Sequence, residues 1–312
     1  MKPTEWWKNF ALGIELDVAG TFIYNGIRAL HELHHFQHPV DSFEILYNLS
    51  VGIERLLKVA IILIEHSESE DLNSLEESLI THNTADLAAR LDKYRPLSLS
   101  AVHREFLTIL SKFYKSQRYG RYSLSIVPDI YEEKRSLLVF IKKHLKIDLD
   151  LENEFLPPPN TNRIRKFVGR IVRKISGNVF EVIKKRASEL NIYTDELRGD
   201  SKAINVFYGD RLDFVDKDLK KKEFILFLMN PSVTSKHIEL LRSQEPLDLD
   251  PSMAASYIKA LLNDADLPYV EEAVDEAYTE ISNVKERLQF LKVMDNDYIS
   301  YSDNDDDAWL ED

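Results

Sequence analysis

The fold is decided by the stretch 43–66, FEILYNLSVGIERLLKVAIILIEH, together with the stretch 80–91, ITHNTADLAARL. Apolar residues recur in the first stretch at helical spacing, which predicts a long helix in the core. Glu54 and Arg55 interrupt its apolar face, and His82 and Asn83 open the second stretch. Because a buried polar side chain costs free energy unless it has a partner, these positions are candidate site residues.

Most of the remaining chain has the same helical period. Only 9 of the 312 residues are glycine, and alternating strand patterns are scarce, so we predict an all-α fold. We expect helices over about 4–37, 42–64, 86–94, 102–113 and 131–144, with later helices starting at Pro251 and spanning about 270–293. One segment, 205–215, favours a β-hairpin centred on Gly209 and Asp210.

Three consecutive prolines, residues 157–159, mark the clearest boundary. Proline cannot continue a helix and favours an extended connector. We therefore predict a helical bundle at 1–150, a second mostly helical domain at 160–294 and a tail at 295–312. The tail has eight acidic residues and no Lys or Arg, and it has too few apolar residues to fold alone, so we expect it to be disordered.

Bulk composition restricts the class of protein. The chain has a net charge of −13, which argues against a surface that binds nucleic acid everywhere. It has no cysteine, which excludes disulfides, thiolate catalysis and Cys-based metal sites. The longest apolar run, 59–64, is far shorter than the ~20 residues that span a bilayer. The start of the chain lacks the apolar core of a signal peptide, so we expect a cytoplasmic protein without a transmembrane segment or cofactor.

A possible metal motif lies at 31–35, HELHH, which matches HExxH. In a zinc peptidase, His31 and His35 would chelate zinc one helical turn apart, and Glu32 would be the general base. Glu54, 19 positions after His35, is at a suitable distance for a third ligand. However, only 30 residues precede the motif, which leaves no room for a preceding sheet. The alternative is a His-rich helix end, where imidazolium suits the helix dipole.

The segment 118–122, RYGRY, brings two guanidinium groups and two phenols together. Arg118 and Arg121 can bind phosphate bidentately, and Tyr119 can stack on a base. The alternative is an aromatic helix end with its arginines in solvent.

The run 163–174, RIRKFVGRIVRK, predicts an amphipathic helix with one cationic face. That face carries Arg163, Arg165, Lys166 and Arg170. It can bind RNA, an anionic membrane surface, or an acidic partner such as this chain's own tail. An ordinary solvated face is the alternative.

The polar pairs of the opening stretches also have ordinary explanations. Glu54 can pair with Lys58 one helical turn away, at the edge of the bundle. Asn83 can cap the following helix. Alternatively, Glu54 faces inward, where it binds the arginines near Arg118 or lines a cleft with His82.

Residues 20–125 resemble the HEPN domains (higher eukaryotes and prokaryotes nucleotide-binding). The order of YNLSVGIERLLK, a loop, THNTADLAARL and a helix that ends in YKSQRYGRY carries the resemblance. It implies a short helical bundle that usually dimerises. Many members of this family are ribonucleases of toxin–antitoxin, phage-defence or RNA-processing systems, and others are non-catalytic binding modules.

Catalytic members carry R-x4-6-H near the start of the last core helix. No histidine follows Arg118 within this spacing, and Arg95 and His103 are too far apart in sequence. The resemblance therefore implies a non-catalytic homodimer that binds RNA, a nucleotide or a partner protein, in a prokaryotic defence or toxin–antitoxin setting. One alternative is a metal-independent ribonuclease in which folding brings His82 or His103 close to Arg118 and Arg121. The zinc peptidase at HELHH is a third hypothesis.

Overall fold

The computed structural model describes residues 6–66, 72–118, 122, 131–151, 157–198, 202–208, 212–263, 267–292 and 294. Within these ranges every regular element is a helix, and an isolated antiparallel bridge joins His35 to Pro159. The predicted all-α fold is confirmed. None of the helices in the described ranges combines the length and the apolar character needed to cross a membrane.

The chain divides into two compact units, Met1–Val215 and Asp216–Asp312. The helices of unit 1 are η1 (Trp7–Ala11), α2 (Leu12–Glu32), α3 (Pro39–Glu65), α4 (Leu72–Ser78), α5 (Thr84–Tyr94), α6 (Ala101–Lys112), η2 (Phe113–Gln117), α8 (Glu132–Leu145), α9 (Asn162–Glu189), α10 (Asp195–Arg198) and α11 (Lys202–Phe207). η1 and η2 are π-helical turns.

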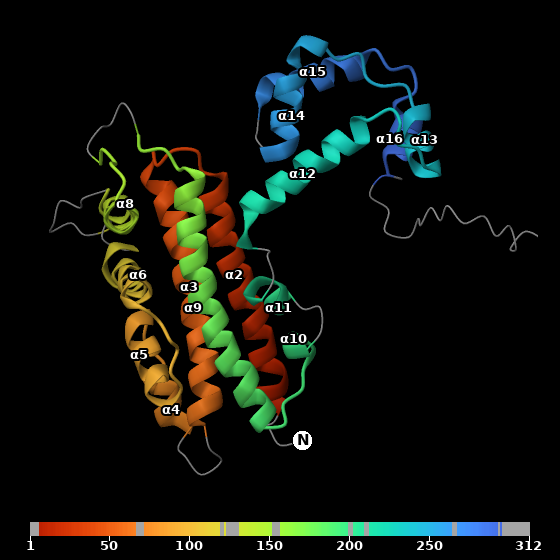
Figure 1. The fold of residues 1–312 in the computed structure, drawn as a ribbon. Helices are drawn as coiled ribbons and strands as arrows, with labels where there is room; N and C mark the ends of the chain where they lie inside the picture. Colours follow the sequence, from red (N-terminus) through yellow and green to blue (C-terminus); the bar gives the residue numbers. More distant parts are fainter. Residues whose placement is uncertain are drawn as a thin grey trace, which may run out of the picture. The chain divides into compact units, whose positions relative to one another are not determined.

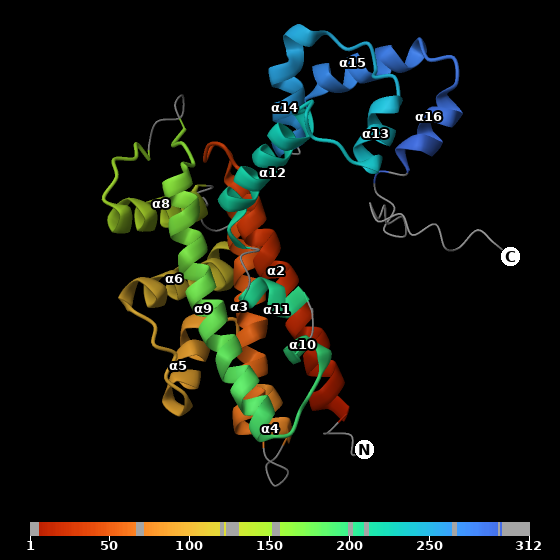
Figure 2. The ribbon, with the colours of Figure 1, turned by 45° about the vertical axis from the view of Figure 1, so that its right-hand side comes forward.

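Helix α3 is the centre of unit 1. It packs against α2, α5, α6, α8 and α9, which explains why its buried residues lie on almost every side. The long helices α2, α3 and α9 run side by side, with α5, α6 and α8 next to them (Figure 1). Figure 2 shows α10 and α11 along the other side of α2.

Two glycines allow α2 and α3 to approach closely. A Cβ atom at Gly52 of α3 would lie 2.7 Å from Cγ1 and 2.9 Å from the backbone nitrogen of Ile23 on α2. A Cβ atom at Gly26 of α2 would lie 2.7 Å from Cγ of Leu49 on α3. The two glycines therefore allow the short separation of the two helices. Buried side chains such as Ile53 lie next to this contact.

The prolines form an extended connector, as predicted, and it lies against the end of α2. The amide of Phe36 donates to the carbonyl of Pro158 at 2.9 Å, and that of Asn160 donates to the carbonyl of His34 at 2.8 Å. The buried Asn160 side chain also donates to the carbonyls of Leu30 and Leu33, at 2.5 and 2.9 Å. The connector thereby satisfies acceptors that the end of a helix leaves open.

The boundary of unit 1 does not coincide with the prolines. Helix α9, which follows them, packs against α3, and the two units divide between Val215 and Asp216. The physical reason is the apolar face of α9, which includes Val168 and Val172 and which the N-terminal helices cover.

The predicted hairpin at 205–215 is wrong. Residues 202–207 form α11, and α12 begins at Phe214, while 209–211 lie outside the described residues. Ala203, Val206 and Phe207 are buried at helical spacing. Packing of this apolar side against α2 and α9 outweighs the local turn signal.

The helices that lie wholly or mostly in unit 2 are α12 (Phe214–Met229), α13 (Lys236–Ser243), η4 (Pro251–Met253), α14 (Ala254–Asn263), α15 (Pro268–Thr279) and α16 (Val284–Leu291). The helix expected over 270–293 is in fact two helices, α15 and α16, and Asn283 caps the second by accepting from the amide of Glu286. Of the described residues from 216 onward, Ile238 is the one buried hydrophobic residue. The acidic tail, 295–312, lies outside the described residues.

Candidate functional site

A polar cluster joins three segments of unit 1: the middle of α3, the loop before α5, and the π-helical turn η2 with its C-cap. We call it the Glu54 cluster, and its members are Glu54, Lys58, His82, Tyr114 and Arg118. Glu54 is only 7% exposed. Its carboxylate lies 2.6 Å from Nζ of Lys58 and 3.1 Å from Nδ1 of His82. Glu54 therefore both pairs along its own helix and binds a side chain from another segment.

Tyr114 connects the two ends of this cluster. Its ring centroid lies 4.5 Å from that of His82 and 3.9 Å from Cζ of Arg118. Tyr47 of α3 stacks on Tyr114, with 6.4 Å between the ring centroids. An imidazole, a guanidinium group and an aromatic surface thus lie next to one another.

Thr84 fixes the loop that carries His82. The buried Thr84 hydroxyl donates to the carbonyl of Leu107 at 2.9 Å and lies 3.0 Å from Oγ of Ser111, both on α6. Ser111 Oγ also accepts from the amide of Ala85 at 3.0 Å. Tyr114 is one helical turn beyond Ser111, so this anchor places His82 against it.

Asn83 is the N-cap of α5, which is the capping role that the sequence predicted as one of two alternatives. Its side chain accepts from the amide of Asp86 and also donates to the Asp86 carboxylate. The amide group of Asn83 therefore serves its own helix end.

A π-helical turn orients the side chains of Tyr114 and Arg118. Helix α6 changes to η2 at Phe113, and Arg118 is the C-cap of η2. Phe113 is buried against Phe43 of α3, while Nε2 of the buried Gln117 donates to Ser136 of α8 at 3.2 Å. These contacts hold both ends of the turn. Single π-helical turns occur often at functional sites, because they redirect side chains within a helix.

The electrostatics of the cluster suit binding of an anion and transfer of a proton. Burial raises the pKa of Tyr114, with Arg118 opposing the shift and Glu54 adding to it, so the phenol keeps its proton. Since Glu54 accepts at Nδ1 of His82, the neutral imidazole presents its lone pair at Nε2. The His82 side chain is 49% exposed, so solvent and ligands can reach it.

The structure thus brings together Glu54, His82 and Arg118 of the predicted site residues. Tyr119 and Arg121 lie outside the described residues. Tyr114 was not among the predicted site residues. Its signal was present, because Tyr114 and Arg118 are four positions apart at the end of a predicted helix.

His103 is separate from the cluster. Its Nδ1 lies 2.7 Å from Oγ of Ser100, in a capping box at the start of α6. Fifteen helical positions separate it from Arg118, which corresponds to about 22 Å. Burial lowers the pKa of His103, and the charge of Lys174 adds to the shift.

The zinc interpretation of HELHH does not match the structure. Helix α2 ends at Glu32, and Leu33 is extended with ψ at 126°, so His31 and His35 do not lie one turn apart on a helix. Glu54 is engaged in its own cluster. In the described ranges no group of three or more His, Asp or Glu side chains is placed to hold a metal ion.

The predicted cationic helix is confirmed as the first half of α9, with its apolar side buried and most of its basic residues exposed. Arg163 donates to the carbonyl of Leu145 at the end of α8. Arg165, Lys166 and Arg170 instead line a pocket between α9 and the end of α2.

No family model, curated protein or solved structure matches this chain. The resemblance to HEPN domains therefore stays a prediction.

Proposed function

We propose that unit 1 binds RNA at the Glu54 cluster and cleaves it there without a metal ion. The observation that carries this proposal is the placement of His82. The buried Glu54 holds one nitrogen of its ring, and Tyr114, which contacts this ring, also contacts Arg118. A positioned imidazole beside a cation is what transesterification of a phosphodiester requires.

The chemistry follows from the nitrogen that Glu54 leaves available. Nε2 of His82 takes the proton of a ribose 2′-hydroxyl, and the 2′-oxygen attacks the adjacent phosphorus. The bond from phosphorus to the 5′-oxygen breaks, and the imidazolium returns its proton to that oxygen. The products are a 2′,3′-cyclic phosphate and a 5′-hydroxyl. Arg118 offsets the charge that develops on the phosphoryl oxygens.

This proposal corresponds to the ribonuclease alternative of the HEPN resemblance, with His82 in place of the missing R-x4-6-H histidine. The resemblance alone supports a homodimer and a role in defence or a toxin–antitoxin pair. The homodimer and the defence role are both part of the proposal. Measurement of the molar mass in solution tests the homodimer.

The test is cleavage of a labelled single-stranded RNA in excess EDTA. We expect His82→Gln to lower the rate by at least about 100-fold, which is the usual contribution of general acid–base catalysis. His103→Gln is the matched control, because it removes an imidazole that lies outside the cluster, and it should cleave normally. The same sequence as DNA lacks the 2′-hydroxyl and should stay intact. Equal cleavage by His82→Gln and the wild type, or loss of cleavage in EDTA, overturns the proposal.

Non-catalytic RNA binding is the second candidate, and one observation favours it. Among the described residues of the cluster, His82 is the only imidazole, whereas phosphodiester transfer is faster with a separate acid and base. In this case wild-type protein binds RNA without cleaving it, and binding weakens steeply with salt. Arg118→Ala then lowers the affinity, and His82→Gln changes it little.

A further inference from the structure

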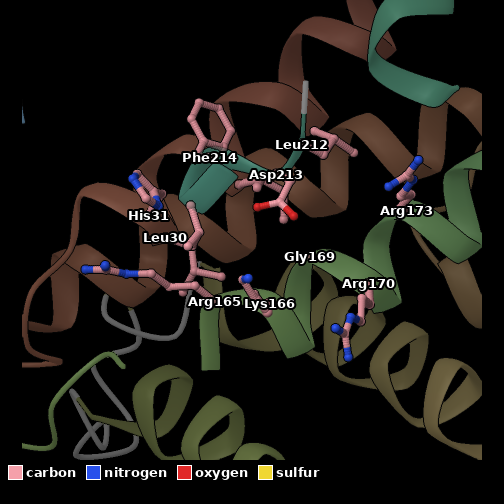
Figure 3. A pocket seen from close by; sticks show the side chains of 12 residues that line it. Leu30, His31, Arg165, Lys166, Gly169, Arg170, Arg173, Leu212, Asp213 and Phe214 are labelled. Carbon is pink, nitrogen blue, oxygen red and sulfur yellow. The ribbon is translucent and has the colours of Figure 1, made fainter. Parts of the chain in front are cut away.

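A second concave site lies in unit 1 between the end of α2, the first half of α9 and residues 212–215. We call it the α9 pocket. It encloses about 50 Å³, which is room for a few waters or one small anion. Four basic side chains of α9 line it, and the acidic residue in its lining is Asp213 (Figure 3). Those basic residues are Arg165, Lys166, Arg170 and Arg173.

Two of these cations are available for a ligand. Lys166 and Arg170 are exposed, and neither forms an ion pair with any residue in the described ranges. They are four positions apart on α9, so their charges lie on the same face and repel each other. An anion between them would remove this repulsion. Arg165, by contrast, donates to the carbonyl of Leu33 at 2.8 Å and to Asn162 at 3.1 Å.

The opposite wall of the pocket is aromatic. The ring of His31 stacks on that of Phe214, with 5.4 Å between centroids and 26° between planes. Figure 3 shows these two rings on one side and Lys166 and Arg170 below and beside them. At Gly169 an added Cβ atom would come no closer than 3.7 Å to the carbonyl of Leu212, so the absent side chain leaves space in the floor of the pocket.

We propose that the α9 pocket binds a phosphoryl group of a nucleotide or of an RNA strand. Lys166 and Arg170 supply the charge, because a guanidinium fork and an ammonium group match the oxygens of a phosphate. The His31 ring, which stacks on the buried Phe214, supplies the surface for a sugar or base. Asp213 repels the ligand and keeps its affinity moderate. The pocket shares no residue with the Glu54 cluster, so this proposal does not depend on RNA cleavage.

The test is calorimetric titration of the full chain with inorganic phosphate, adenosine monophosphate, and a short RNA with either a 5′-phosphate or a 5′-hydroxyl. Lys166→Ala/Arg170→Ala should weaken binding of the phosphorylated ligands at least about tenfold, since each charged hydrogen bond contributes that much. Asp213→Asn should strengthen binding several-fold. Lys184→Ala/Lys185→Ala removes two charges from α9 outside the pocket and should bind as the wild type does.

The ligands distinguish the two sources of the phosphoryl group. Tightest binding of adenosine monophosphate supports a nucleotide, and preference for the 5′-phosphorylated RNA over its 5′-hydroxyl form supports a strand end. No binding of any of these ligands by the wild type overturns the proposal. Equal weakening in the pocket variant and the Lys184→Ala/Lys185→Ala control also overturns it, because it would show a general effect of surface charge. Loss of cleavage in His82→Gln bears only on the Glu54 cluster.

Discussion

Replacement of Gly52 by alanine is the sharpest test of the packing that supports the Glu54 cluster. Gly52 lies two positions before Glu54, where α3 meets α2. The new Cβ atom would lie 2.7 Å from Cγ1 of Ile23, 2.9 Å from its backbone nitrogen and 3.0 Å from the carbonyl oxygen of Ala19. Two of these three atoms belong to the backbone of α2, so a change of rotamer cannot relieve the overlap.

The size of the effect follows from these distances. Carbon atoms in contact are ordinarily about 3.5–4.0 Å apart, so the Cβ atom would be roughly 1 Å too close. Overpacking of a core typically costs about 1–3 kcal/mol, and the backbone contacts place Gly52→Ala at the upper end. The higher helix propensity of alanine offsets about 1 kcal/mol of this cost. We therefore expect a net loss of about 2 kcal/mol, or a fall in Tm of about 4–8 °C.

Thermal unfolding followed by circular dichroism measures this change. Gly177→Ala is the matched control, because Gly177 also lies within a long helix and its Cβ atom would meet the carbonyl oxygen of Phe207 at an ordinary 3.5 Å. This control should gain up to about 1 kcal/mol from helix propensity. If Gly52→Ala is as stable as Gly177→Ala, the close approach of α2 and α3 is refuted.

Three further predictions concern the anchors of unit 1. Thr84→Val removes the hydrogen bond to the carbonyl of Leu107 and should cost about 1–2 kcal/mol in urea unfolding, while unchanged stability would contradict the anchor. The amide of Leu97 donates to Asp92 and lowers its pKa, so this carboxylate stabilises the fold at pH values above its unfolded pKa of about 3.9. The stabilisation is lost as the pH falls through the lower folded pKa, and Tm between pH 5 and 2.5 should fall more steeply in the wild type than in Asp92→Asn. Asn160→Ala leaves acceptors at the end of α2 unsatisfied and should cost about 2 kcal/mol by the same urea measurement.

The helices themselves could be predicted because their signals are local. The apolar period of 43–66 indicated α3, and the capping residue Asn83 indicated α5. Where α9 packs could not be predicted, because its apolar face has the same pattern whether it covers α3 or a separate core. At 205–215 a local turn signal favoured a hairpin, whereas burial of Val206 and Phe207 favours α11.

The candidate site could be predicted in part, for a similar reason. Glu54 and His82 stood out as polar residues in apolar surroundings, but the contact between them joins positions 28 apart and depends on how α5 and α6 pack. No local pattern indicated that Thr84 would fix this loop to Ser111. The α9 pocket depends on contacts among three distant segments, so only its row of cations could be predicted from the sequence.

The π-helical turn η2 has a consequence for chain length in evolution. An i→i+5 turn takes in one residue more than an α-helical turn. Deletion of one codon at Lys115 or Ser116, both exposed, would let α6 continue as an α-helix, and the residues after the turn would keep their direction, because the deletion removes the extra residue of the turn. Arg118 would then stay on the same side of the helix as Tyr114, and the contact between Glu54 and His82 would remain. Homologous chains that are one residue shorter at this turn should therefore retain both the imidazole and the guanidinium group.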